Sequence, residues 1–336
     1  MVNVAPLDWV DTEQTPISVI PHSTLGFIVL VKYNVCGPDG RCLGSLPNTG
    51  YYHSAHMSAD AVVALVSDNR VHIYDLRRSP FTLVDTIISN DRPTCCALSA
   101  TGRYITVCYA KYPSFHSMVL FEVGGNRTAS FRFKRWSQQL CSVFSPCDGF
   151  VATGGADGIA TVWCAKTRKP IVTLPHLRAV VAVAVSLDSA RLATSSDMSL
   201  FLYSLRGENT ICTHQIKLDT DGFGIGCAFS PIVPHLLATS GGQDATLQLW
   251  DAEKGVSLEQ VKNCRAVDMQ FLPGGQRLAV LDERCNVGIC WLPSDMCTPP
   301  ATLLVLLIAT RRMGCKLPDE LWWYLLSIFF PSIIKN

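Results

Sequence analysis

Residues 140–164 of the chain read LCSVFSPCDGFVATGGADGIATVWC, and this stretch decides the fold. Apolar residues alternate up to Phe144 and return over residues 150–153 and 159–163, with the turn-forming segments SPCDG and GGADG between them. The pattern predicts three short strands joined by tight turns. Such a meander cannot bury both of its faces by itself, so we expect further copies along the chain.

The aromatic residue that closes this stretch recurs at a regular spacing. Trp163 follows Asp157 by six residues, and three other Asp and aromatic pairs share that offset. Two further units, residues 95–123 and 266–292, keep the pattern imperfectly. The closing aromatics are 40 to 47 residues apart, a period typical of four-stranded propeller blades. The other three pairs are Asp68 and Tyr74, Asp197 and Tyr203, and Asp244 and Trp250.

Each unit also carries a turn in its middle, preceded by an apolar strand. These turns start at Ser58, Ser99, Ser145, Ser186, Ser230 and Leu272. No helical periodicity of any length occurs before residue 300, so we expect an all-β body. Six units are visible, and residues 16–49 offer a seventh as a degenerate blade without its last strand. We favour seven blades over six, because a closed ring protects the edges of the first and last blades.

Composition divides the chain into four parts. Residues 1–14 are expected to form an irregular lead-in, 15–292 the propeller, 293–301 a linker and 302–336 a helical tail. The tail reads as two helices, and the second begins with proline and two acidic residues at 318–320, as helix N-termini do. The apolar residues of that second helix fall on one stripe. Two apolar helices after a complete propeller indicate a partner.

The repeated units resemble the WD-repeat family over roughly residues 50–292. The resemblance is strongest in residues 143–163 and 227–251. It implies a structural hydrogen-bond network in the blades, carried by Thr153, Asp157, Trp163, Asp197, Tyr203, Thr239, Asp244 and Trp250. The leading histidine of the family survives only as His176, and a true Trp-Asp pair occurs once, at Trp250 and Asp251, so the chain is a divergent member.

The tail segment KLPDELWWYLLSIF, residues 316–329, is similar to the opening helix of an F-box and to the end of a SOCS box. Both families recruit cullin-type ubiquitin ligases, so the resemblance implies that the tail binds a cullin adaptor. The alternative is a helical hairpin that packs on the propeller itself. The partner-binding residues implied by the resemblance are Leu317, Pro318, Leu321, Tyr324, Leu325 and Ile328.

Charge and cysteine content narrow the cellular setting. The chain has 28 basic and 27 acidic residues, so its net charge of +1 creates no overall attraction to nucleic acid. Its 15 cysteines are scattered without a CxxC pair, which indicates reduced thiols. The N-terminal residues lack the pattern of a signal peptide, and the apolar runs of the tail fall short of the ~20 residues of a membrane span. We expect a cytoplasmic protein, with the nucleus as the alternative.

The sequence shows no pattern typical of a catalytic, cofactor or metal site. His53 and His56 lack a third ligand nearby, and the glycines of residues 154–158 lack the strand-to-helix setting of a phosphate loop. Residues 131–136, FRFKRW, alternate aromatic and basic side chains as lipid- or base-binding segments do, but an outer blade strand explains them too. The predicted function is a non-enzymatic protein-interaction scaffold, and a substrate receptor of a cullin-type ligase is the sharper hypothesis. The alternative is a membrane-peripheral adaptor, and an enzymatic propeller ranks third.

Overall fold

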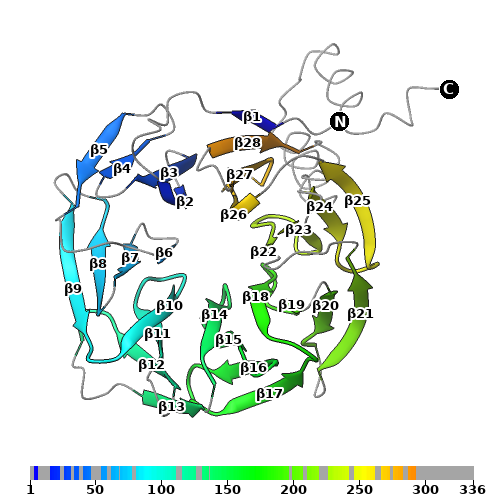
Figure 1. Ribbon diagram of the computed structural model, residues 1–336, viewed down its shortest axis with the longest axis horizontal. Helices are drawn as coiled ribbons and strands as arrows, with labels where there is room; N and C mark the ends of the chain where they lie inside the picture. Colours follow the sequence, from blue (N-terminus) through cyan, green and yellow to red (C-terminus); the bar gives the residue numbers. More distant parts are fainter. Residues whose placement is uncertain are drawn as a thin grey trace, which may run out of the picture.

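The structure is a computed structural model, and within the described residues its strands form seven four-stranded antiparallel sheets. Figure 1 shows the sheets standing around a common axis, which is the arrangement of a seven-bladed propeller. The seven-blade prediction is therefore confirmed, and the six-blade alternative is wrong. The described residues are 4–6, 16–22, 26–31, 34–37, 41–46, 54–58, 62–67, 69–77, 81–110, 116–125, 131–135, 137–196, 199–206, 210–218, 226–241, 246–261, 266–272, 275–282 and 287–292.

The first four blades follow one another along the chain, each with its strands in sequence order from the axis outward. Blade 1 consists of β2 (Pro16–His22), β3 (Gly26–Val31), β4 (Asn34–Cys36) and β5 (Cys42–Ser45). Blade 2 consists of β6 (Ser54–Met57), β7 (Val62–Val66), β8 (Arg70–Asp75) and β9 (Thr82–Ile88). Blade 3 consists of β10 (Arg92–Leu98), β11 (Tyr104–Ala110), β12 (His116–Glu122) and β13 (Phe131–Arg135). Blade 4 consists of β14 (Gln139–Phe144), β15 (Phe150–Gly155), β16 (Ile159–Cys164) and β17 (Pro170–Pro175).

The last three blades complete the ring. Blade 5 consists of β18 (Val180–Val185), β19 (Arg191–Ser196), β20 (Ser199–Ser204) and β21 (Ile211–Lys217). Blade 6 consists of β22 (Gly226–Phe229), β23 (Leu236–Gly241), β24 (Thr246–Asp251) and β25 (Val256–Val261). Blade 7 consists of β26 (Ala266–Phe271), β27 (Arg277–Asp282), β28 (Val287–Trp291) and β1 (Val4–Pro6). Every closing aromatic predicted from the sequence lies on the third strand of its blade.

The seventh blade takes its outermost strand from the other end of the chain. β1 pairs with β28 in antiparallel register, with Val4 opposite Cys290 and Pro6 opposite Gly288. The prediction that residues 1–14 form an irregular lead-in is therefore wrong for residues 4–6. Three residues are too few to show a period-2 pattern, and their proline is tolerated because the strand lies at a sheet edge.

Blade 1 is complete, whereas the sequence predicted a loop in place of its last strand. β4 and β5 pair with each other, and the Ser45 hydroxyl donates to the Asn34 side-chain oxygen at 2.8 Å. Val35 is fully buried in an apolar cluster that it shares with Val63 and Leu65 of blade 2. The two strands are only three and four residues long and are separated by a Gly- and Pro-containing segment, which is why their alternation could not be recognised.

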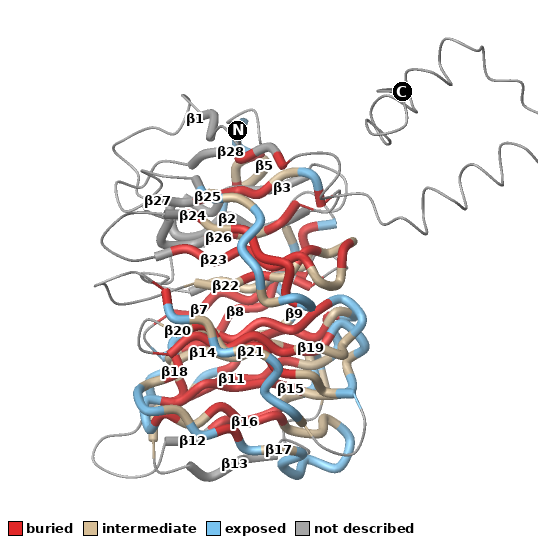
Figure 2. Tube along the Cα trace, turned by 90° about the vertical axis from the view of Figure 1, so that its right-hand side faces the viewer, coloured by how far each residue is buried: buried red, intermediate tan, exposed pale blue. Residues whose placement is uncertain are grey.

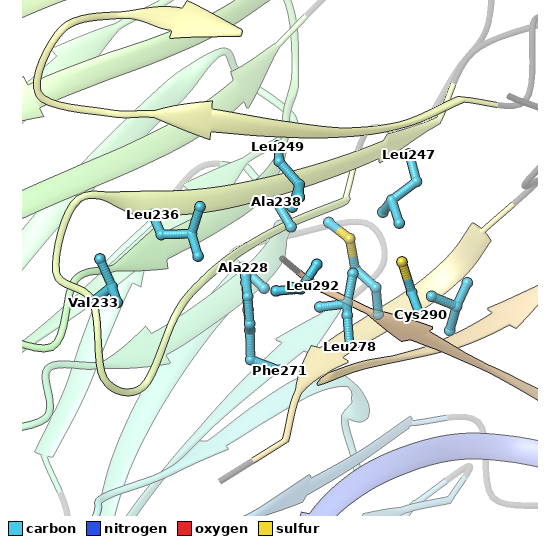
Figure 3. Packing of buried hydrophobic residues seen from close by; sticks show 12 residues of the cluster. Ala228, Val233, Leu236, Ala238, Leu247, Leu249, Phe271, Leu278, Cys290 and Leu292 are labelled. Atoms are coloured by element: carbon cyan, nitrogen blue, oxygen red, sulfur yellow. The ribbon is translucent and has the colours of Figure 1, made fainter. Parts of the chain in front are cut away.

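The hydrophobic core lies between the blades, where the face of one sheet packs on the face of the next. Figure 3 shows one such layer, in which Leu247 and Leu249 of blade 6 meet Leu278 and Cys290 of blade 7. Figure 2 shows the buried residues running along the strands and the exposed residues gathering in turns and on outer strands such as β21. Because each buried leucine contributes about 1.5–3 kcal/mol, every blade depends on both of its neighbours.

The turn between the first and second strands is built in the same way in five blades. A buried serine follows the first strand, and its hydroxyl accepts a hydrogen bond from a backbone amide three to five residues further on, at 2.9–3.2 Å. We call these five segments the serine turns. Their serines are Ser58, Ser99, Ser145, Ser186 and Ser230. The hydroxyl replaces water for an otherwise buried amide, so the turn closes without an unsatisfied donor.

The turn of blade 4 is also bonded to the turn of blade 3. Asp148 has a left-handed backbone with φ of 56°, which residues other than Gly adopt rarely. Its carboxylate accepts the Ala100 amide at 2.7 Å and the Thr101 hydroxyl at 2.8 Å. The left-handed conformation therefore places a carboxylate where it holds two blades together.

Ring closure generates the first prediction. A chain that starts at residue 7 lacks β1, so its free energy of unfolding should fall by about 1–3 kcal/mol through the loss of a few sheet hydrogen bonds. The measurement is urea unfolding followed by circular dichroism. A chain that starts at residue 4 keeps β1 and is the matched control, and equal losses in the two truncations would contradict a role for the strand.

Candidate functional site

In blades 4 and 6 the predicted threonine and tryptophan of each blade are hydrogen-bonded to each other. The indole nitrogen of Trp163 donates to the Thr153 hydroxyl at 3.1 Å, and that of Trp250 donates to the Thr239 hydroxyl at 2.9 Å. Each bond joins the second and third strands of its blade. Thr153, Thr239 and Trp250 are buried and Trp163 is partly buried, so these side chains are engaged within the blades.

The predicted acidic residues are placed only in part. The Asp157 carboxylate accepts the Ile159 amide at 3.2 Å, so it braces the turn that leads into the third strand of blade 4. Asp197 and Asp244 lie outside the described residues. Leu317, Pro318, Leu321, Tyr324, Leu325 and Ile328 of the tail also lie outside them, as does the whole helical tail predicted over residues 302–336.

In blade 5 a cluster of His176, Thr194 and Tyr203 takes the place of the threonine–tryptophan hydrogen bond of blades 4 and 6. The Nε2 atom of His176 lies 2.8 Å from the Thr194 hydroxyl and 3.2 Å from the Tyr203 hydroxyl, while its Nδ1 atom lies 3.0 Å from the Leu174 carbonyl oxygen. A carbonyl oxygen can only accept, so Nδ1 carries the proton and Nε2 accepts. The sequence pointed to Tyr203 but not to Thr194, although Thr194 precedes its aromatic by nine residues, close to the offset in blades 4 and 6.

The His176 ring is held in its neutral form. Burial lowers its pKa, against the opposing effect of hydrogen bonds to the backbone of Leu174 and Gly158. The Phe201 ring packs edge-on against the imidazole, with 4.7 Å between the ring centroids. A neutral, packed histidine fixes the start of the loop that connects blades 4 and 5.

That loop, residues 176–179, is held by two hydrogen bonds to neighbouring turns. The His176 amide donates to the Gly158 carbonyl at 2.7 Å, and the Ser196 hydroxyl donates to the Arg178 carbonyl at 2.8 Å. Gly158 has φ of +75°, and a Cβ atom there would lie 2.7 Å from the His176 carbonyl oxygen, so only glycine fits. Turns from both blades therefore clamp the loop from either side.

Leu177 projects from this clamped loop and is 94% exposed. We call residues 176–178, together with Gly158 and Ser196, which hydrogen-bond to them, the Leu177 corner. A single exposed leucine is common on protein surfaces, but this one sits on a backbone that is already ordered. Burying it against a partner would contribute about 1.5–3 kcal/mol without the entropy cost of ordering a loop. The corner is thus a preformed apolar contact point.

Other candidate sites named from the sequence gain little from the structure. Among the described residues, no three His, Cys, Asp or Glu side chains lie close enough to hold a metal ion. No helix in the described part of the chain is long and apolar enough to cross a membrane. Residues 131–135 form β13, the outer strand of blade 3, as the sequence indicated for the FRFKRW segment.

The two tryptophan bonds generate the second prediction. Thr239→Val should lower the free energy of unfolding by about 1–3 kcal/mol, because the buried Trp250 indole loses its acceptor. Thr153→Val should cost less, about 0.5–1.5 kcal/mol, because Trp163 is only partly buried. Thr82→Val, at an exposed position of β9, is the control and should stay within about 0.5 kcal/mol of the parent. Equal losses for all three in urea unfolding would contradict this ranking.

Comparison with known proteins agrees with this architecture. The WD domain, G-beta repeat family matches residues 130–164. Over 123 residues the chain is 28% identical to a guanine nucleotide-binding protein subunit beta-like protein of Encephalitozoon cuniculi (strain GB-M1), an alignment that covers 36% of each protein. Over 131 residues it is 29% identical to Protein tipD of Dictyostelium discoideum, and this alignment covers 36% of this chain and 20% of that protein. With seven four-stranded antiparallel blades and a WD repeat over residues 130–164, the chain has the fold of a WD-repeat β-propeller.

Proposed function

We propose that the chain is a non-enzymatic protein-interaction scaffold of the cytoplasm or nucleus and that the Leu177 corner is one of its docking points. The observation that carries the proposal is a leucine, 94% exposed, on a loop whose backbone and flanking histidine are fixed by hydrogen bonds. A preorganised apolar contact point favours association, because little conformational entropy is lost on binding. One relative is named as a subunit-like protein, which supports a role in assembly with other chains.

The distribution of polar groups supports the same proposal. Thr153, Thr194 and Thr239 are buried and hydrogen-bonded to aromatic or histidine side chains of their own propeller. These groups hold the blades in shape, and their rigidity is passed on to the connecting turns. Loops on a rigid β scaffold are where binding residues of proteins concentrate, so the turns are the expected site of recognition.

The third prediction concerns Leu177. Leu177→Asp should remove a bound partner while leaving the melting temperature unchanged, because the side chain is exposed and makes little contact within the propeller. The partner is first identified by placing a photo-cross-linking amino acid at position 177 in the full chain expressed in cells. We expect the cross-linker at position 177 to capture another protein. That protein should co-purify with the parent chain and be lost from the Leu177→Asp chain.

Leu83 provides the matched control for this experiment. It is 48% exposed and lies on β9, the outer strand of blade 2, away from the Leu177 corner. Leu83→Asp should leave the co-purified partner in place. If both substitutions act alike, or if position 177 yields no adduct with another protein, the Leu177 corner is not a docking point.

A sharper form of the proposal concerns the tail. We infer from the Leu-Pro-x-x-Leu pattern of residues 317–321 that residues 302–336 recruit a cullin adaptor, which would make the propeller the part that holds the substrate. The apolar stripe of the second helix, predicted from its 3.6-residue period, supports a helix that docks into a groove of another protein. Recognition of substrate and recruitment of the ligase would then occupy separate parts of the chain.

The fourth prediction tests the tail. The full chain should co-purify with a cullin adaptor protein, and a chain that ends at residue 292 should not. Leu321→Asp should reproduce the loss, because it places a charge within the predicted apolar stripe. Ser327→Asp adds the same charge off that stripe and is the control. Recovery of the adaptor by all four chains would overturn the proposed role of the tail and leave that of Leu177 untouched.

A further inference from the structure

The ends of blades 5 and 6 form a cleft of about 190 Å³ on the face that carries the serine turns. In an antiparallel blade the first and third turns lie at one end of the strands and the second turn at the other, so this face is opposite to the Leu177 corner. The cleft lies where β20 and β21 of blade 5 approach the end of β24 in blade 6. Its lining residues are Ala190, Arg191, Tyr203, Ser204, Arg206, Thr213, Ala252 and Glu253.

Four charged side chains form a row of ion pairs along this cleft. Asp188 accepts Arg206 at 2.9 Å and Arg191 at 3.0 Å through the same carboxylate oxygen, and Arg191 contacts Glu253 of blade 6 at 3.3 Å. The order is therefore Arg206, Asp188, Arg191, Glu253. Two arginines are brought to one cleft, and each contributes a guanidinium that can bind a carboxylate or a phosphoryl group through two donors at once.

Asp188 is fixed in the turn and holds the arginines in place. Its other oxygen accepts the Ser186 hydroxyl at 2.6 Å and the Ala190 amide at 3.1 Å. Partial burial would raise the pKa of this carboxyl, but the hydrogen bonds from Ser186, the Ala190 amide and Arg206, with the charge of Arg191, lower it overall. The carboxylate therefore stays ionised and oriented, and it acts as a positioning residue for both arginines.

Glu253 is the weakly held member of the row. Its side chain is 65% exposed, and its single contact with Arg191 is longer than the 2.7–2.9 Å of a strong charge-assisted hydrogen bond. Exposed ion pairs of this kind contribute little to stability. Arg191 is only 16% exposed, so a carboxylate that displaces Glu253 would meet a partly desolvated guanidinium. The Glu253 carboxylate thus marks the point at which a carboxylate from another molecule would meet Arg191.

We propose that this cleft binds an acidic side chain, either a carboxylate or a phosphorylated residue, of a peptide segment in a protein partner. Arg206, which is 66% exposed, and Arg191 bind the oxyanion, and Glu253 swings into solvent. The assignment of a peptide as the ligand rests on the proposed scaffold function. It is favoured by the exposed Leu187, next to Asp188 in the chain, and by Ala190 and Ala252 in the lining, which provide apolar contacts for the residues around the acidic one.

The test uses the full chain and short capped peptides that carry Leu-Glu-Leu, Leu-phosphoserine-Leu or Leu-Gln-Leu, with binding followed by fluorescence anisotropy. The acidic peptides should bind at least about tenfold more tightly than the Gln peptide. Arg206→Gln should weaken their binding by about tenfold, whereas Glu253→Gln should strengthen it several-fold by removing the internal competitor. Unchanged affinity in either variant would overturn the proposal.

Arg103→Gln is the matched control, because Arg103 is also an exposed, ion-paired arginine but lies in blade 3. It should leave binding unchanged, and a loss equal to that of Arg206→Gln would show that only net charge matters. Inorganic phosphate that binds as tightly as the phosphopeptide would overturn the peptide assignment. Leu177→Asp should bind the acidic peptides normally, so failure at the Leu177 corner and failure at this cleft are distinguishable.

Discussion

The closure of the ring, in which blade 7 packs on blade 1 and takes its outer strand β1 from residues 4–6, is the constraint on which the rest of the structure depends. Each blade covers one face with the next blade, so an open ring would leave two apolar sheet faces against water. Leu247 and Leu249 of blade 6 are fully buried because blade 7 is there to cover them, and blade 7 is complete because residues 4–6 return to its edge. The matched WD repeat runs from β13 of blade 3 to β16 of blade 4, so the repeat in sequence is offset by one strand from the blade in space. This offset is what allows one end of the chain to complete the blade formed by the other.

Ring closure fixes the ends of each turn. Side chains on fixed turns can bind a partner with little further loss of conformational entropy. The buried serines satisfy backbone amides on one face, and the groups around Trp163, Trp250 and His176 act within blades 4, 6 and 5. At Leu177 and at the cleft beside Arg206, the exposed side chain is surrounded by groups whose hydrogen bonds are already made. The framework residues therefore matter for recognition through the positions they impose, even though they are buried.

The sequence predicted the parts of the molecule that repeat and missed those that occur once. The offset between Asp157 and Trp163, the turns at the serines and the outer strand FRFKR all depend on residues close in the chain, so a local pattern reveals them. β1 pairs with the other end of the chain, and Asp148 contacts Ala100 of another blade 48 positions away. β4 and β5 of blade 1 are close in the chain, but at three and four residues they are too short to show a pattern. The two arginines of the cleft are likewise 15 residues apart and meet only because Asp188 lies between them. Such contacts follow from the closed ring and have no period of their own.

Tyr203 lies between the two proposed binding sites, since it lines the cleft and its hydroxyl contacts His176 beside Leu177. A side chain in this position is the candidate for energetic coupling between the two sites. Coupling would require it to have two discrete arrangements that the ligands favour differently. Tyr203 is 6% exposed and packs within the apolar cluster between blades 4 and 5, and its hydroxyl is held by the neutral His176 ring. Because Tyr203 has one packed arrangement in the structure, we expect the two proposed sites to bind independently.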